Sequence, residues 1–177
     1  LKEKLAQESF SRVTISFYKY FIIKEPSVYR DSLYEQLDQL NVFGRIYIAE
    51  EGINAQISVP EKYWYEFLSI LDSFEALKNI RLNKAIEDDG RSFYKLMIKV
   101  RTKIVADGLS DDSFDVTNVG KHLSAEEFNN AIDNGAIVVD IRNHYESEVG
   151  HFENAICPDV DTFKEELSEV INVLNNK

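Results

Sequence analysis

The chain has 177 residues, a hydrophobic fraction of 44% and a formal net charge of -11, which together indicate a folded globular protein and exclude a disordered one. It contains no apolar run of about 18 residues, so we expect no transmembrane helix and no membrane partner. Its one cysteine, Cys157, excludes an intrachain disulfide and favours the reducing cytoplasm as the compartment.

The charge is distributed unevenly along the chain. Residues 1–105 hold 16 basic and 15 acidic side chains, whereas residues 106–177 hold 4 and 16. Such an asymmetry indicates a domain boundary and leaves the N-terminal part free to meet a polyanion. The predicted segments are an N-terminal arm at 1–12, a first domain at 13–105, a polar linker at 106–121 and a second domain at 122–177.

The first domain is predicted to have a ferredoxin-like α+β fold. Hydrophobic periodicity and turn residues divide it into strands and amphipathic helices. In chain order we expect a strand at 13–23, a helix at 29–41, strands at 45–49 and 53–59, a helix at 61–73 and strands at 80–86 and 93–105. This β-α-β-β-α-β order, with one extra strand, places both helices on one face of a mostly antiparallel sheet and leaves the other face open.

The last predicted strand presents a basic side. Because side chains alternate along a strand, Leu96 and Ile98 point toward the helices and the basic residues point the other way. Cations beside an aromatic ring on an open sheet are suited to holding phosphates and stacking a base. The alternative is a solvated face whose lysines discourage edge pairing. The RNA-binding candidates on this side, next to Phe93 and Met97, are Lys95, Lys99, Arg101 and Lys103.

The turn at 51–54 supplies further RNA-binding candidates, namely Glu51, Gly52 and Asn54. Gly52 has no side chain, so a nucleotide can approach the backbone closely there. The alternative is a plain hairpin turn that needs no ligand.

The second domain is predicted to be part of an α/β domain. Residues 136–141 are apolar on both faces, as in a central strand of a parallel sheet. Capping boxes at 124–127 and 162–165 open helices, and a short strand is expected near 155–157. A further strand is due after the last helix, so we expect the rest of the domain beyond Lys177. The alternative is a degenerate domain that pairs its open strand edge with another subunit. The residues expected to face inward from the last helix are Phe163, Leu167, Val170, Ile171 and Leu174.

A motif begins at the end of the apolar strand. Asp140 and Arg142 are followed by Tyr145-Glu146, Gly150-His151-Phe152, Ala155-Ile156 and Pro158, an order that resembles the opening half of rhodanese domains. Because open α/β sheets bind ligands at the carboxyl ends of their strands, Asp140, Arg142 and Glu146 are substrate-loop candidates. The alternative is an ion pair and a turn that hold the loop in place. Cys157 lies among apolar residues and is predicted to be buried and structural.

Three segments extend this resemblance to the whole chain: EGIN at 51–54, KLMIKVR at 95–101 and VDIRNHYESEVGHFENAICP at 139–158. From about Phe17 onward, the chain resembles the rhodanese-like tRNA uridine hydroxylase family. The resemblance implies an oxidoreductase that hydroxylates the wobble uridine 34 of tRNA to 5-hydroxyuridine. Molecular oxygen would be the co-substrate, no cofactor would be bound, and the anticodon arm of tRNA would be the partner. It also implies that the active cysteine follows Lys177, so that this chain holds no catalytic residue and is inactive by itself.

Two other functions are compatible with the same residues. One is a rhodanese-type sulfurtransferase that carries a persulfide on the same cysteine, and the other is a non-catalytic RNA-binding or interaction module.

His122 and His144 lack cysteine or carboxylate partners at metal-ligand spacing, so we predict no metal site. Residues 24–30 lack the glycine-rich phosphate cradle of an acylphosphatase. We expect no DNA partner.

Overall fold

The chain forms two compact units, residues 1–105 and 106–177. The computed structural model describes residues 8–86, 92–104, 118, 120–160 and 163–175. Residues 87–91 between the last two predicted strands, most of the linker expected at 106–121 and the start of the 162–165 capping box lie outside these residues.

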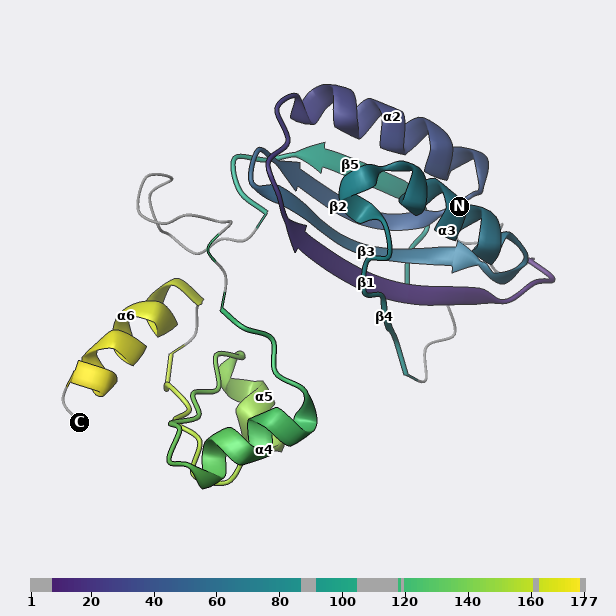
Figure 1. Cartoon of the computed structure of the whole chain (residues 1–177). Helices are drawn as coiled ribbons and strands as arrows, with labels where there is room; N and C mark the ends of the chain where they lie inside the picture. Colours follow the sequence, from purple (N-terminus) through teal and green to yellow (C-terminus); the bar gives the residue numbers. More distant parts are fainter. Residues whose placement is uncertain (1–7, 87–91, 105–117, 119, 161–162, 176–177) are drawn as a thin grey trace. The chain divides into compact units, whose positions relative to one another are not determined.

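The first unit follows the predicted order and is an α+β fold (Figure 1). Two short 3-10 helices, η1 (Glu61–Tyr63) and η2 (Glu75–Leu77), flank helix α3 (Trp64–Ser73). The helices and strands are β1 (Arg12–Tyr20), α2 (Pro26–Gln39), β2 (Phe43–Ala49), β3 (Gly52–Pro60), α3 (Trp64–Ser73), β4 (Asn83–Lys84) and β5 (Leu96–Val100).

The strands form one mixed sheet in the order β4-β1-β3-β2-β5. β1 pairs antiparallel with β3 and β4, β2 pairs antiparallel with β3, and β5 pairs parallel with β2 at the opposite edge from β4. The two last strands are shorter than the predicted 80–86 and 93–105. Ile80 donates its N–H to the Leu77 carbonyl at 3.1 Å, so its backbone closes a turn and is not available to a strand.

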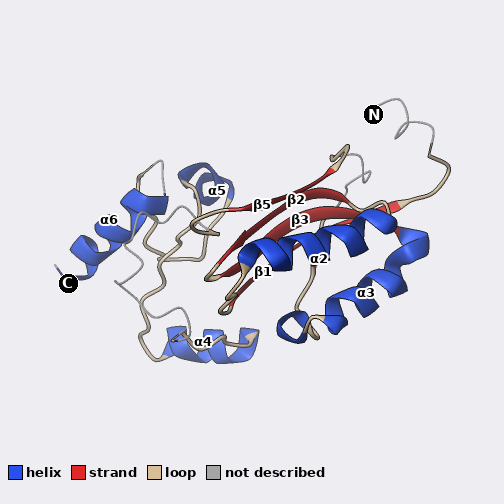
Figure 2. Cartoon of the chain, turned by 90° about the horizontal axis from the view of Figure 1, so that it is seen from above, coloured by secondary structure: helices blue, strands red, loops and turns tan. Residues whose placement is uncertain are grey.

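The core lies between the sheet and the two helices, which both cover the same face (Figures 1 and 2). α2 contacts β2 and β5, and α3 contacts β3. Leu96 and Ile98 are buried on this side, as predicted. Within the first unit the helices thus leave the other face of the sheet uncovered. The fully buried larger side chains include Ile15, Phe17, Leu33, Leu37, Ile46, Ile48, Ile53, Ile57, Phe67 and Leu71.

Two glycines allow neighbouring strands to approach each other. Gly44 has φ 138°, and a Cβ there would lie 2.3 Å from the Gln56 carbonyl oxygen. Gly52 has φ 150°, and a Cβ there would lie 2.1 Å from the Lys19 carbonyl oxygen. L-residues rarely adopt this region, so both positions need glycine for the sheet itself.

The second unit contains α4 (Ala125–Asp133), α5 (His144–Val149) and α6 (Phe163–Asn175). The capping box predicted at 124–127 is present: the Ser124 hydroxyl accepts from the Glu127 N–H at 3.2 Å, and the Glu127 carboxylate accepts from the Ser124 N–H at 2.8 Å. The sequence did not predict α5, a six-residue helix.

The prediction that residues 136–141 form a buried central strand is wrong for this structure. It is reduced to one parallel bridge between Val139 and Ile156, and the side chains of Ile137 and Ile141 are 53% and 40% exposed. A strand is buried on both faces only where further strands and helices cover it, and within the described residues Ile156 is its one bridge partner. The same cover is lacking at α6, where Ile171 is 59% exposed instead of facing inward.

Two further expectations for the second unit concern its packing. Cys157 is half-buried, not buried, with its Sγ 3.8 Å from the Ala155 carbonyl oxygen. Leu174 is 41% exposed, whereas the side chains of Phe163 and Leu167 lie outside the described residues. The buried Leu, Ile, Val, Phe and Ala side chains of the described residues all belong to the first unit.

Candidate nucleic-acid interface

The uncovered face of the sheet, here called the open face, combines cations, aromatic rings and small polar groups. Alternation along β1, β2, β3 and β5 directs these side chains away from the helices, and the register aligns them in rows across the sheet. None of the described strands contains an Asp or a Glu. Its strand residues include Thr14, Ser16, Tyr18, Arg45, Tyr47, Asn54, Gln56, Asn83, Met97 and Lys99.

The cations of the open face lie against its rings. The Arg45 guanidinium carbon is 5.9 Å from the centroid of the Phe93 ring, and that of Arg101 is 5.4 Å from the centroid of Tyr47. Lys99 lies opposite Tyr47 in the pairing of β5 with β2. A guanidinium that stacks on a ring stays partly dehydrated and still offers its N–H donors to a phosphate.

These cations remain available to an anionic ligand. No carboxylate in the described part of the chain forms an ion pair with Arg45, Lys99 or Arg101. All three residues are exposed. The open face is therefore a local concentration of positive charge on a chain whose formal net charge is -11.

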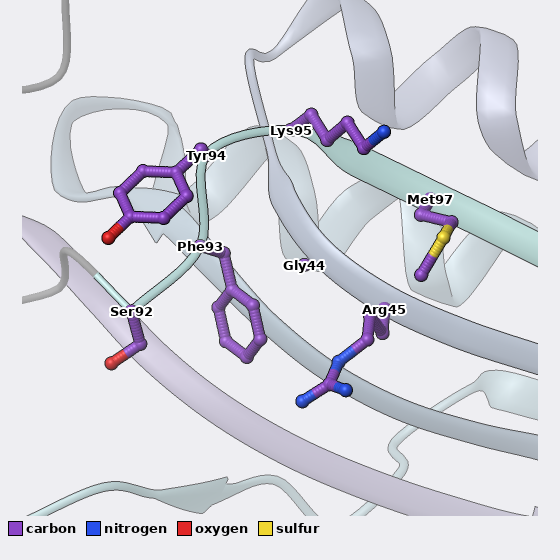
Figure 3. Close-up of a pocket in the computed structure, with 7 residues that line it drawn as sticks. All are labelled: Gly44, Arg45, Ser92, Phe93, Tyr94, Lys95 and Met97. Carbon is purple, nitrogen blue, oxygen red and sulfur yellow. The ribbon is translucent and has the colours of Figure 1, made fainter. Parts of the chain in front are cut away.

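A hollow of about 400 Å³ opens where the chain enters β5 (Figure 3). Phe93 and Arg45 lie beside each other there, whereas the Lys95 side chain extends away from the Arg45 guanidinium (Figure 3). A ring and a planar cation at the wall of one hollow provide surfaces on which a base can stack. The hollow is lined by Gly44, Arg45, Ser92, Phe93, Tyr94, Lys95 and Met97.

The structure places the predicted RNA-binding residues in two different settings. Lys95 lines the hollow at the entry to β5, whereas Lys99 and Arg101 lie on the open face beside Tyr47. Lys103 lies beyond the end of β5 and is half-buried.

The 51–54 turn has a structural role that the sequence did not reveal. The Glu51 carboxylate accepts a hydrogen bond from the Ile104 N–H at 2.7 Å, and the Asn54 amide donates to the Ile104 carbonyl at 3.4 Å. These two side chains hold the segment that follows β5, and Gly52 permits the approach of β1. Arg45, Tyr47 and Tyr18 were missed, although the alternation of polar and apolar residues along β2 would have placed the first two on the open face.

Asp140 and Arg142 form a two-point ion pair in the second unit. The Arg142 Nε donates to Asp140 Oδ1 at 2.9 Å, and its Nη2 donates to Asp140 Oδ2 at 2.6 Å. Nη2 also donates to the Gly150 carbonyl at 2.7 Å, so the pair ties the two ends of the loop together. Hydrogen bonding from Arg142 is the main cause that holds the pKa of Asp140 below its usual value.

Glu146, the third substrate-loop candidate, caps a helix. Its carboxylate accepts from the Asn143 N–H at 3.3 Å and from the Asn143 amide at 3.0 Å, where α5 begins. A hollow of about 720 Å³ lies beside the ion pair, between the Val139 segment and the Phe128 and Phe152 rings, whose centroids are 4.9 Å apart. The geometry therefore contains the loop-holding ion pair and turn that the sequence left as the alternative.

No group of three or more His, Cys, Asp and Glu side chains in the described part is arranged to hold a metal ion. Within the same residues, no helix combines the length and the apolar character that crossing a membrane requires.

Comparison with known proteins adds a family model and close relatives. Residues 12–104 match the UPF0176 acylphosphatase like domain. The chain is 56% identical to a protein named tRNA uridine(34) hydroxylase from Leptospira interrogans, over 100% of this chain and 48% of that protein. It is 53% identical to the protein of that name from Enterobacter sp. strain 638, over 98% and 50%, and 52% identical to that of Yersinia enterocolitica, over 99% and 51%. The chain thus spans about half the length of the curated relatives it matches.

Proposed function

The chain belongs to the UPF0176 acylphosphatase-like family, and we propose on this basis that it is part of a tRNA-modifying oxidoreductase that hydroxylates uridine 34. Identities of 51–56% over nearly the whole chain to proteins named for this activity support the proposal. The product is 5-hydroxyuridine, the RNA element bound is the anticodon arm, and the compartment is the cytoplasm.

The first unit contributes the RNA-binding surface. The observation that carries this assignment is the open face, where cations stack on aromatic rings and the described strands carry no carboxylate. Phosphate contacts supply most of the affinity of proteins for nucleic acids, and exposed Lys and Arg without internal partners make such contacts at the smallest desolvation cost.

The chemistry belongs to the whole protein. Replacing the C5 hydrogen of uracil by a hydroxyl group is a two-electron oxidation. We propose molecular oxygen as the co-substrate and no bound cofactor: one oxygen atom enters the ring and the other leaves as water, with two electrons and two protons supplied by an external two-electron reductant. The second unit is proposed to be rhodanese-like, with Asp140 and Arg142 positioning its loop. The catalytic cysteine is expected in the part of the relatives' length that this chain does not span, so the chain by itself binds RNA without modifying it.

Acylphosphatase chemistry is not part of the proposal, although the family model carries that name. Between β1 and α2 the N–H groups of Phe21 and Ile23 donate to the Glu51 and Glu50 carbonyls at 2.9 and 2.8 Å. They cannot also cradle a phosphate. Glu25 is the N-cap residue of α2, so its negative charge disfavours an anion at this helix end, and Pro26 leaves the first turn with one N–H donor fewer.

The test is a nucleoside analysis of tRNA from cells that lack the full-length protein. We expect mass spectrometry to detect loss of 5-hydroxyuridine and of nucleosides derived from it, with recovery when the full-length protein is restored. Unchanged levels of these nucleosides would contradict the proposal. Loss of thiolated nucleosides with 5-hydroxyuridine unchanged would support the sulfurtransferase instead.

A further inference from the structure

The strongest unassigned feature is a row of side chains that crosses the whole sheet. Pairing places Asn83 opposite Ser16, Ser16 opposite Gln56, Gln56 opposite Arg45, and Arg45 opposite Met97. Every strand of the sheet contributes one member. The row is polar at the β4 edge and ends beside a cation and a thioether at the β5 edge.

Two hollows that share Phe93 in their walls are lined by members of this row. The hollow of about 400 Å³ contains Arg45 and Met97, and a second hollow of about 250 Å³ contains Ser16, Gln56 and Asn83. Phe93 lines both of them. A half-buried ring between two hollows therefore offers contact surface to two ligand groups at once.

The two hollows differ in chemistry. The first offers the Arg45 guanidinium, which is 5.9 Å from the Phe93 centroid, and it suits a base that stacks next to a phosphate. The second offers the side-chain amides of Gln56 and Asn83 and the hydroxyl of Ser16, which suit hydrogen bonds to the edge of a base.

We propose that Phe93 is a wedge between two successive unpaired nucleotides of an RNA loop, with one base in each hollow. The inference deepens the proposed function, because it rests on RNA being the ligand of the open face. Paired RNA is excluded from the two hollows, since only bases that are unstacked from their neighbours can enter on either side of a ring.

Binding of two RNAs to the full-length protein tests the wedge. One is an anticodon-arm hairpin that carries 2-aminopurine in its loop, and the other is a fully paired RNA duplex. Phe93→Ala should raise the Kd for the hairpin by about 5- to 150-fold, the range for loss of one stacked base, and leave the Kd for the duplex unchanged. In the same Phe93→Ala variant, the change in 2-aminopurine fluorescence on hairpin binding should be lost.

Matched variants keep the test decisive. Phe93→Leu retains an apolar side chain without a ring and should also weaken hairpin binding, whereas Phe93→Trp should retain it. Tyr65→Ala removes a ring that is 83% exposed on α3 and should have no effect. Hairpin binding by Phe93→Leu at the wild-type Kd, or equal weakening of hairpin and duplex, would overturn the proposal.

The results distinguish failure of the wedge proposal from failure of the proposed function. If Phe93→Leu restores 5-hydroxyuridine fully and binds the hairpin normally, the wedge is wrong and the tRNA-modifying function stands. If deletion of the protein leaves tRNA nucleosides unchanged while Phe93→Leu loses hairpin binding, the wedge stands and the modification assignment is wrong.

Discussion

Arg12, the first residue of β1, is a buried cation that several neighbouring groups contact. Its Nη1 donates to the Asn41 carbonyl at 3.0 Å and to the Ser58 carbonyl at 3.3 Å, its Nε pairs with Glu8 at 2.7 Å, and its guanidinium lies 4.0 Å from the centroid of Phe43. Removing the guanidinium leaves these partners unpaired in a largely dry environment.

Arg12→Met should lower the free energy of unfolding by about 3 kcal/mol. Urea denaturation followed by circular dichroism measures this loss. Arg81→Met is the matched control, because Arg81 is exposed and the same substitution there should change stability by about 0.5 kcal/mol or less. Equal effects of the two variants would show that the Arg12 contacts add no more to the free energy of unfolding than an exposed arginine does.

Tyr29 is a buried hydroxyl without a hydrogen-bond partner among the described residues, and burial raises the pKa of Tyr29 to about 12. Tyr29→Phe should raise the free energy of unfolding by about 1 kcal/mol at pH 7. In the unfolded chain the group ionises near its ordinary pKa of 10.0. The native state of the wild type therefore loses stability as the pH rises from 10 through 12, and the variant does not.

The measurement for Tyr29 is urea denaturation of both proteins at pH 7 and pH 11. The advantage of Tyr29→Phe should be larger at the higher pH. A wild type that is the more stable protein at pH 7 would mean that the Tyr29 hydroxyl has a partner.

At the scale of elements, β5 depends on the side chains that it packs under α2. Ile98 is 7% exposed, whereas Val100 on the same strand is 40% exposed. Ile98→Ala should therefore lower the free energy of unfolding by about 2–5 kcal/mol, and Val100→Ala should lower it by about 1 kcal/mol or less. Thermal and urea unfolding of both variants measure the difference, and comparable losses would place β5 outside the cooperative core.

The sequence predicted the elements of the first unit more reliably than their pairing. Period-2 and helical patterns depend on each residue's own neighbours, so the order of strands and helices and the burial of Leu96 and Ile98 followed from them. The parallel pairing of β5 with β2 did not, because no local pattern records which edge a strand joins.

The candidate site was predictable only in part for the same reason. Lys99 and Arg101 followed from alternation, but the contact between Arg45 and Phe93 joins residues far apart in sequence. The strand predicted at 136–141 failed because its burial depends on neighbours, and α5 was missed because six residues are too few to display a period. Asn143 and Glu146 were an available signal for α5, since they form its capping pair.

At the scale of the whole molecule, charge is separated between the two units. The acidic side chains are in excess in residues 106–177, whereas residues 1–105 are almost neutral and carry the open face. Overall charge therefore opposes binding to RNA, and affinity must come from the local field of the open face. High salt should accordingly weaken tRNA binding even though this 177-residue chain is acidic.

The salt dependence of tRNA affinity is the most direct measure of the claim that the open face holds phosphates. In the full-length protein, Arg45→Glu, Lys99→Glu and Arg101→Glu, the three exposed cations of the open face, are combined in one variant. A control variant reverses three exposed cations outside the strands and makes the same change in net charge, at Lys62, Lys78 and Arg81.

Each phosphate contact contributes about 0.7 to the slope of log affinity against log salt concentration for a single-stranded nucleic acid. The open-face variant should lose about 2 units of this slope together with most of its tRNA affinity, whereas the control should keep the wild-type slope. An unchanged slope in the open-face variant, or an equal loss in both variants, would contradict the assignment of the open face as the RNA-binding surface.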